Sequence, residues 1–278
     1  MDLYDVNGFT VTKCKECSLC FIREMPSDDF LKEYYTVTNQ NADVKTVYHD
    51  EDNVKNLNYA YETSANRIKE MLKLNPPIHD TGAPRLLDLG CSLGRFFDFF
   101  PDWDVYGVEI EEVAGNIAKS KHENVFVGDM KDADFEKNFF DCVNMQDSLD
   151  HSNDPIAVVK HSYEFLKEGG FIVIKVHNIN CLLAKVSGKR FYAIVPPEHL
   201  TYFNLKTLKL LLSANGFEYV NHYYDTQKLS LRTILMRISV TFPFFTPIYK
   251  AVSKSALGSM TLRKNFHDII TVIARKKV

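Results

Sequence analysis

The stretch Arg85–Phe100, RLLDLGCSLGRFFDFF, decides the fold of this chain. Its aliphatic start is typical of a short buried strand, and Gly90–Gly94 indicates a tight turn. Three phenylalanines follow at helical spacing, which predicts a helix over about residues 94–100. A strand, a glycine turn and a helix in this order place backbone N–H groups at the carboxyl end of a strand. Open α/β sheets bind ligands at that edge.

The glycine pattern narrows the class of ligand. The dinucleotide fingerprint G-x-G-x-x-G fails, because its second and third positions are Ser92 and Arg95, and no Gly-Lys-Ser/Thr ending of a phosphate loop follows. The turn therefore suits a ligand that needs close backbone approach but carries no phosphate. Glu109 ends the next predicted strand about twenty residues on, the spacing at which a carboxylate meets a ribose diol. Asp129 ends the third predicted strand.

These segments resemble the class I S-adenosylmethionine-dependent methyltransferases. Residues 88–94, DLGCSLG, are similar to the first motif of that family, with Ser92 at its usual central glycine. Glu109 matches the acid that binds ribose, and Asp129 matches the residue that meets the adenine amino group. Residues 140–146 match the fourth strand and residues 166–171 the turn before the fifth, so the matches follow the family's order across 85–176.

The resemblance implies an α/β fold: a Rossmann-like, doubly wound, seven-stranded sheet, mostly parallel with an antiparallel last strand. It implies S-adenosylmethionine as the cofactor and a small molecule as the substrate. The cofactor-binding residues implied are Asp88, Gly90, Cys91, Ser92, Gly94, Glu109, Ile110, Asp129, Met130 and Gln146. The alternative is a nucleotide-binding α/β domain without methyl transfer.

Length and composition fit one core with appendages. The chain has 278 residues, is 45% hydrophobic and carries a formal net charge of −3, so its balance does not indicate nucleic-acid binding. Residues 1–12 lack the apolar run of a signal peptide, and arginines and prolines interrupt the longest apolar region. The six cysteines do not indicate a disulfide framework in a chain of this length, and Cys91, Cys142 and Cys181 are scattered. We therefore expect a cytoplasmic protein.

Hydrophobic periodicity and Gly/Pro breaks predict the elements and domains. We expect a ribbon-like remnant and loop over 1–53, with 36–53 as loop, and a methyltransferase domain over 54–278. That domain would comprise a core at 85–176, a substrate-side region at 177–203 and a helical insertion at 225–267. The predicted helices are 54–74, 94–100, 112–121, 154–167 and 205–214, and the predicted strands are 85–89, 104–109, 125–128, 140–145, 171–176, 217–224 and 269–274.

The N-terminal segment has half of a tetrahedral zinc motif, Cys14-x-x-Cys17, with Cys20 as a third sulfur and no close histidine. It resembles the second half of the zinc ribbon that precedes some bacterial sugar-modifying methyltransferases, with Ser18 at a glycine position. Leu19, Phe21, Tyr34 and Tyr35 also match that pattern. Because the ligand set is incomplete, we favour a β-turn remnant without metal.

Methylation of a hydroxyl requires a proton acceptor, and histidine suits that task. His199, in the segment Pro196–Phe203 on the expected substrate side, is the first candidate catalytic residue. His151 is the second, because it follows the fourth strand in a Leu-Asp-His pattern where the family has Leu-Glu-His. His177 is the third. For His151, an orienting hydrogen bond or a helix-entry contact is an equally open role.

The insertion carries an apolar stripe flanked by Lys and Arg. It suits a lid or a dimer face, or a peripheral membrane contact through 229–256. The favoured reaction is O-methylation of a sugar, nucleotide-sugar or related metabolite in polysaccharide or secondary-metabolite synthesis. A membrane quinone or lipid precursor as acceptor, and a cofactor-binding subunit without turnover, are the alternatives.

Overall fold

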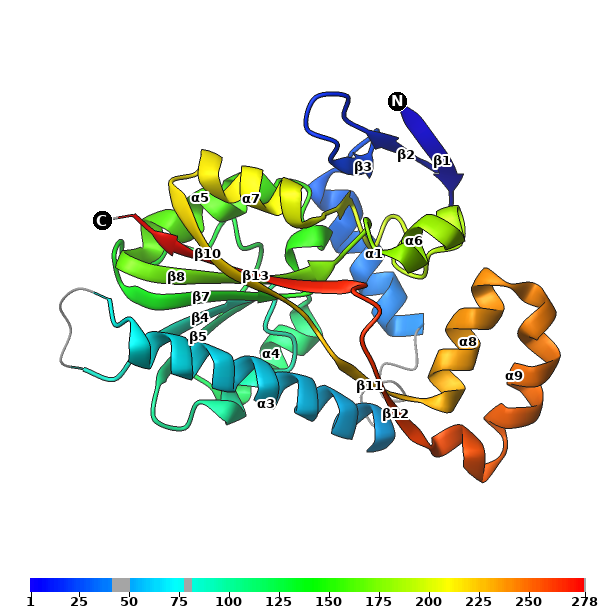
Figure 1. Ribbon diagram of the computed structural model, residues 1–278. Coiled ribbons are helices and arrows are strands. Elements are labelled where there is room, and N and C mark those ends of the chain that lie inside the picture. The colour runs from blue at the N-terminus through cyan, green and yellow to red at the C-terminus, as the bar shows by residue number, and fades with distance from the viewer. Residues whose placement is uncertain (42–50, 78–81, 278) are drawn as a thin grey trace.

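A computed structural model describes residues 1–41, 51–77 and 82–277, with side chains described from 1–35, 54–77 and 82–277. Its centre is a seven-stranded sheet of order β10-β13-β8-β7-β4-β5-β6 (Figure 1). The strands are β4 Arg85–Leu89, β5 Asp104–Glu109, β6 Val125–Val127, β7 Phe140–Gln146, β8 Leu166–His177, β10 Phe217–Tyr224 and β13 Ile269–Lys276. The predicted Rossmann-like sheet, seven-stranded and mostly parallel with an antiparallel last strand, is confirmed.

Parallel pairing joins β4 to β5 and β7, β5 to β6, and β7 to β8. β13 runs antiparallel to β8 and β10, as expected for the last strand. The strand order reverses at β4, because β5 lies on one side of it and β7 on the other. The carboxyl ends of these three strands therefore flank the switch point. A doubly wound sheet binds ligands at that place.

Helices cover both faces of this sheet (Figure 1). α3 Glu51–Leu74 packs on one face through Ala65, Ile68 and Leu72. α5 Pro155–Phe165 and α7 Leu205–Ala214 contribute to the core on the other face, and α4 Glu112–Lys121 packs through Ala118 near β6. Asn204 caps α7 with a capping box, because its side chain and that of Thr207 satisfy each other's backbone N–H groups.

Two predicted segments differ from the structure in the kind of element that they form. Residues 95–99 form a 3₁₀ helix, η1, instead of an α-helix over 94–100, because Gly94 adopts φ 72° at its start and Pro101 closes the segment within two turns. The loop predicted over 36–53 is wrong at both ends. α1 Asp28–Asn41 extends into it and α3 begins at Glu51. Residues 42–50 lie outside the described part of the chain.

The N-terminal segment forms a four-stranded sheet of order β1-β2-β3-β9. β1 Asp2–Val6, β2 Phe9–Lys13 and β3 Cys20–Ile22 are consecutive, but β9 Thr201–Tyr202 comes from the predicted substrate-side region. A core of its own, including Ile22, Leu200 and Phe191, lies between this sheet, α6 Leu182–Ser187 and η3 Gly188–Arg190. The pairing therefore ties residues 1–35 to the segment that contains His199.

The insertion between β10 and β13 is a helical hairpin on a two-stranded base. β11 Gln227–Ser230 pairs with β12 Thr261–Lys264, and between them lie α8 Leu231–Thr241, η4 Pro243–Phe245, α9 Thr246–Ser253 and η5 Ala256–Ser259. Figure 1 shows this hairpin (orange) projecting from the rest of the molecule. Within the described residues, no helix has the length and apolar character needed to cross a membrane.

Candidate active site

A cavity of about 480 Å³ lies at the carboxyl ends of β4–β7. It brings together eight residues that the sequence predicted to be functional and that come from five different segments. They are Gly90, Ser92, Glu109, Ile110, Asp129, Met130, Gln146 and His151. Tyr34 and Tyr35 of α1 and Tyr61 of α3 close the cavity from the N-terminal side. The sheet edge, α1 and α3 thus form one pocket.

The turn after β4 requires glycine at its first position. Gly90 has φ 85°, and a Cβ there would lie 2.5 Å from the Cβ of Ser148. Ser148 is itself fixed, because its hydroxyl donates to the Leu89 carbonyl at 2.6 Å. Ser92 also has a positive φ, 50°, which explains why glycine is usual in the resembled motif and marks a strained residue at the cavity wall.

Glu109 is fixed at the end of β5 by two backbone N–H groups. Its Oε2 accepts from Ser92 N at 2.7 Å and its Oε1 from Glu111 N at 2.9 Å. Burial raises the pKa of Glu109, although these hydrogen bonds favour the carboxylate. Each oxygen keeps a further lone pair that could accept a hydroxyl proton, as binding of a ribose diol requires.

Gln146 and Lys175 add polar groups to the same wall. The side-chain amide of Gln146 is buried, and neither its nitrogen nor its oxygen has a hydrogen-bond partner among the described residues. Lys175 Nζ lies 3.2 Å from Asp147 Oδ2. Burial lowers the pKa of Lys175, but the carboxylates of Asp147 and Asp225 raise it more, so Lys175 keeps its charge. A ligand with both donors and acceptors would satisfy this wall.

Five predicted residues do not line the cavity: Asp88, Cys91, Gly94, His177 and His199. Asp88 lies beneath the turn, where it accepts from Asn144 Nδ2 at 2.7 Å, and burial raises its pKa to about 7. The Cys91 sulfur faces the backbone of Gly107, and Gly94 packs against α4. Asp88, Cys91 and Gly94 therefore lie behind the turn, away from the cavity.

A carboxylate and three imidazoles cluster beside the cavity. Asp150, only 2% exposed, lies 3.5 Å from His177 Nδ1 through Oδ2 and 4.0 Å from His151 Nε2 through Oδ1. The ring of His199 stands 4.7 Å from that of His151 and 5.0 Å from that of His177, between centroids. Among the four, His151 alone borders the cavity, and Tyr35 Oη lies 3.2 Å from its Nδ1.

The cluster is arranged for a buried negative charge. Burial alone would raise the pKa of Asp150, but the contact with His177 and the nearby imidazoles lower it overall. The same carboxylate raises the pKa of His177 against the opposing effect of burial. His199 responds differently: burial lowers its pKa, and its Nδ1 donates to the Ala193 carbonyl at 2.7 Å. The lowered pKa favours the neutral ring, and the hydrogen bond from Nδ1 leaves Nε2 as its acceptor.

Asp150, His151 and His199 each offer an atom of the type that binds metals, and these atoms lie within 4.8 Å of one another. The cluster therefore has side chains that could hold a divalent cation as well as side chains that could move a proton. The described part of the chain contains no other group of this kind, so Cys14, Cys17 and Cys20 do not assemble into one.

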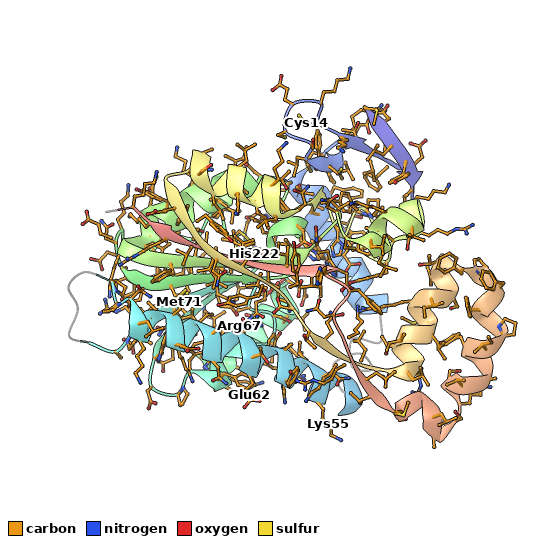
Figure 2. All side chains as sticks on the ribbon, viewed as in Figure 1. Cys14, Lys55, Glu62, Arg67, Met71 and His222 are labelled. Atoms are coloured by element: carbon orange, nitrogen blue, oxygen red, sulfur yellow. The ribbon has the colours of Figure 1, made fainter. Side chains whose placement is uncertain are left out.

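The N-terminal cysteines lie apart from the cavity. Cys14 is in the β2–β3 loop (Figure 2), and the Ser18 N–H donates to the Cys14 carbonyl at 3.1 Å. Ser18 has φ 70°, the left-handed conformation that glycine supplies at this position in the resembled ribbon. Cys20 is buried in the N-terminal core.

Sequence reasoning missed Asp150, Lys175 and Ser148. Asp150 had a visible signal, because an acid directly before a candidate histidine at a strand end is a natural partner for an imidazole. Lys175 gave none, since its side chain reaches the cavity from within the otherwise apolar run Phe171–Val176. Ser148 contacts Gly90, but the two residues lie in different loops that are far apart in sequence, so nothing in the sequence signalled the contact.

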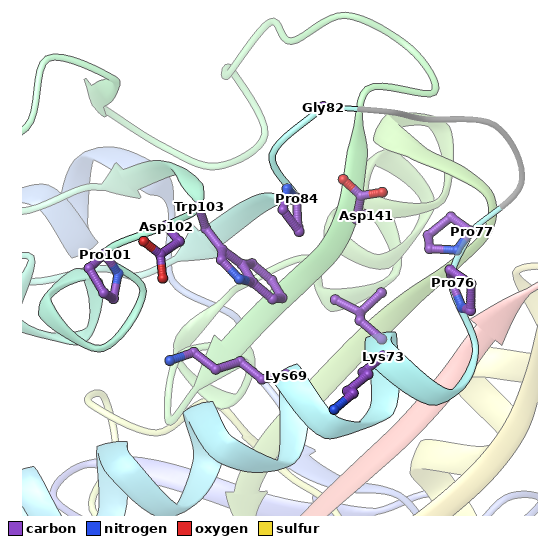
Figure 3. A pocket seen from close by; sticks show the side chains of 11 residues that line it. Lys69, Lys73, Pro76, Pro77, Gly82, Pro84, Pro101, Asp102, Trp103 and Asp141 are labelled. Carbon is purple, nitrogen blue, oxygen red and sulfur yellow. The ribbon is translucent and has the colours of Figure 1, made fainter.

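A second cavity, of about 370 Å³, lies at the opposite ends of the strands (Figure 3). Lys69, Lys73, Trp103 and Asp141 line it, and Pro84 precedes β4 there. Asp141 accepts from the Arg85 N–H and pairs with Lys167, so its carboxylate is already satisfied. Because ligands bind at the carboxyl edge of such sheets, we place the active site in the first cavity.

Comparison with known proteins identifies the family. Residues 56–222 match the family model of a methyltransferase domain, and the chain belongs to that family. No curated protein matches the sequence. A SAM-dependent methyltransferase from Thermotoga maritima, described as a possible histamine N-methyltransferase, is similar in structure, with TM-score 0.56, 17% identity and coverage of 87% of this chain and 99% of that one.

A SAM-dependent methyltransferase from Archaeoglobus fulgidus is also similar, with TM-score 0.51, 20% identity and coverage of 78% of this chain and 94% of that one. At these levels of sequence identity, the structural similarity shows the fold alone. Together with the family model they support a SAM-dependent methyltransferase whose cofactor is S-adenosylmethionine. The site residues present suit this cofactor, since the turn accepts close approach and Glu109 and Gln146 have free hydrogen-bonding capacity.

Proposed function

We propose that the chain methylates a hydroxyl of a sugar, nucleotide-sugar or related small metabolite in polysaccharide or secondary-metabolite synthesis. The observation that carries this proposal is the Asp150 cluster beside the cavity. When bound, S-adenosylmethionine supplies an electrophilic methyl group on a good leaving group. The protein then has to orient the acceptor and remove its proton.

In this proposal Gly90, Ser92, Glu109 and Asp129 hold the nucleoside, and Gln146 faces the methionine portion. Glu109 accepts from the ribose hydroxyls and Asp129 from the adenine amino group. Ile110 covers a face of the base, and the Met130 N–H donates to a ring nitrogen. The other predicted binders, Asp88, Cys91 and Gly94, keep the turn in shape. Support comes from the shared cavity and from the unpartnered amide of Gln146.

His151 accepts the proton, because its ring alone among the cluster borders the cavity. An imidazolium formed by protonation at Nδ1 directs its Nε2–H toward the Asp150 carboxylate, which stabilises the positive charge. Tyr35 Oη lies 3.2 Å from Nδ1, so in this proposal its hydroxyl gives its proton to Nδ1 as it takes the proton of the acceptor hydroxyl. His199, the first choice from sequence, lies behind His151, and we assign it to positioning that ring.

The sugar-type acceptor rests on the resemblance of residues 14–35 and 196–203 to sugar-modifying methyltransferases. β3 pairs with β9, so the two resembling segments form one structural unit beside the cavity. The apolar insertion favours the second candidate, a membrane-associated lipid or quinone precursor, because many of its apolar side chains are exposed.

The test measures S-adenosylhomocysteine release with a panel of sugars, nucleotide-sugars, phenols and polyprenyl or quinone precursors. We expect turnover with a hydroxylated sugar and a loss of at least a hundredfold in kcat for His151→Ala, with unchanged cofactor affinity by calorimetry. His199→Ala should lower kcat less. Turnover confined to the lipid precursors would exclude the sugar acceptor, and full activity of His151→Ala would remove it from the mechanism.

We also expect methyl transfer to proceed without metal. Incubation with EDTA followed by desalting should leave kcat unchanged, because the Asp150 cluster is assigned to proton transfer. Loss of activity on chelation, with recovery on adding Zn²⁺ or Mg²⁺, would instead assign Asp150, His151 and His199 to a cation.

A further inference from the structure

The insertion between β10 and β13 has a charge unlike the rest of the chain. Residues 226–267, the basic hairpin, contain seven Lys and Arg residues and no Asp or Glu, although the whole chain has a formal net charge of −3. Such a one-sided distribution gives the hairpin a positive field of its own. A partner that complements it would be anionic.

The hairpin also exposes large apolar side chains. No residue of α9 is buried, and Thr241 is the sole buried residue of α8. Phe244 is 72% exposed, Leu257 62% and Val240 57%. Further exposed apolar side chains are Met236, Ile248, Met260 and Leu262. So many apolar side chains on one protruding element indicate an interaction surface.

Lysines lie among these apolar residues. Lys250 and Lys254 are exposed and stand one turn apart on α9. Neither forms a salt bridge with a described residue, so their charges remain available. Lys and Arg beside exposed Phe, Ile and Leu are characteristic of helices that lie in the interface of a bilayer with anionic headgroups.

The hairpin emerges at the edge of the sheet that holds the active site. β13 begins at Ile269, which pairs with His177 at the carboxyl end of β8. The Arg237 guanidinium lies 4.3 Å from the ring centre of Tyr192, which belongs to the region around His199. The base of the hairpin therefore lies at the same edge of the sheet as the cavity.

We propose that the basic hairpin docks on the surface of an anionic lipid bilayer, with Phe244 and its apolar neighbours inserted at the headgroup boundary and Lys250 and Lys254 paired with lipid phosphates. A second copy of the chain is a poorer occupant, because a symmetric dimer would bring two positive hairpins together. This inference does not depend on the methyl acceptor or on turnover.

Vesicle flotation of the full chain tests the proposal. Vesicles of phosphatidylcholine with one third phosphatidylglycerol should carry the protein upward at low salt, and vesicles of phosphatidylcholine alone should not. Each cation at such a surface contributes about a fivefold change in binding. Lys250→Gln/Lys254→Gln should therefore weaken binding about 25-fold, and Phe244→Ser at least tenfold.

Matched control variants lie elsewhere on the surface. Lys119→Gln/Lys121→Gln removes two basic residues from the last turn of α4, and Leu182→Ser removes an apolar side chain that is 75% exposed on α6. Both should float like wild type. Three results would each overturn the proposal: no flotation with anionic vesicles, equal flotation with neutral vesicles, or a dimer in sedimentation that Phe244→Ser dissociates.

Discussion

At the scale of single residues, backbone conformation decides the turn after β4, where we propose that the cofactor binds. Gly90 combines φ 85° with a close approach to Ser148, whereas Gly8 has φ 82° with no atom within 4 Å of an added Cβ. Both glycines adopt a positive φ, but only at Gly90 would an added Cβ collide with a neighbouring side chain. They therefore separate the two contributions experimentally.

Gly90→Ala should lower the melting temperature and weaken S-adenosylmethionine binding at least tenfold, because the new Cβ forces Ser148 and the turn apart. Gly8→Ala should cost only about 1–2 kcal/mol of backbone strain and leave cofactor affinity unchanged. Calorimetric titration and thermal unfolding of both variants check this. Wild-type affinity in Gly90→Ala would show that the turn does not touch the cofactor.

Asp150→Asn should destabilise the fold more at pH 5.5 than at pH 8.5. The pKa of His177 is raised in the folded protein, so the stabilisation from its pairing with Asp150 is present below its unfolded pKa, about 6.5, and is lost as pH rises through the raised value. The amide removes that pairing and leaves a buried imidazolium without its counter-charge. Urea unfolding at both pH values measures the difference, and an equal loss at both would contradict it.

At the scale of elements, the sequence predicted those helices and strands whose ends depend on residues close by in the chain. The predicted and observed bounds agree for five elements, whose ends are marked by Gly, Pro, helix caps and apolar runs: β4, β5, α4, α7 and β10. α5 and β8 differ from prediction because the chain passes directly from helix to strand at Leu166, so β8 starts five residues early. β9 could not be predicted, since its partner β3 lies about 180 residues away in sequence.

The same limit applies to the site. The cofactor wall follows from strand ends, which a sequence reveals through periodicity. The Asp150 cluster requires β7, β8 and the segment after Val195 to meet, which depends on the tertiary fold. His151 and His199 were found by residue type, but their order relative to the cavity was not.

The basic hairpin should be separable from the fold. β11 and β12 pair from Ser230 and Thr261 outward, so replacing residues 231–260 by Asn-Gly closes a two-residue hairpin. The Lys264–Asp268 ion pair is retained. We expect this variant to bind S-adenosylmethionine like wild type and to lose vesicle flotation. Loss of cofactor binding would instead make the hairpin part of the catalytic domain's structure.

At the scale of the whole molecule, three layers of structure converge on one edge of the sheet. The Rossmann-like core supplies the turn and the two acids, and the N-terminal sheet with α1 supplies Tyr35 and braces the His199 segment. The insertion leaves from the same edge through β11 and β12. The proposed cofactor site, the proposed proton acceptor and the base of the proposed membrane-binding hairpin thus lie at one edge of the sheet.

The central claim is that successive strand ends bind S-adenosylmethionine, and titration calorimetry with wild type, Glu109→Gln and Glu112→Gln tests it most directly. Glu112 is an exposed acid three residues away and serves as the control. We predict one binding site, at least tenfold weaker binding for Glu109→Gln because a charged acceptor of the ribose hydroxyls is lost, and no change for Glu112→Gln. Absence of binding to wild type, or equal affinity in Glu109→Gln, would contradict the account.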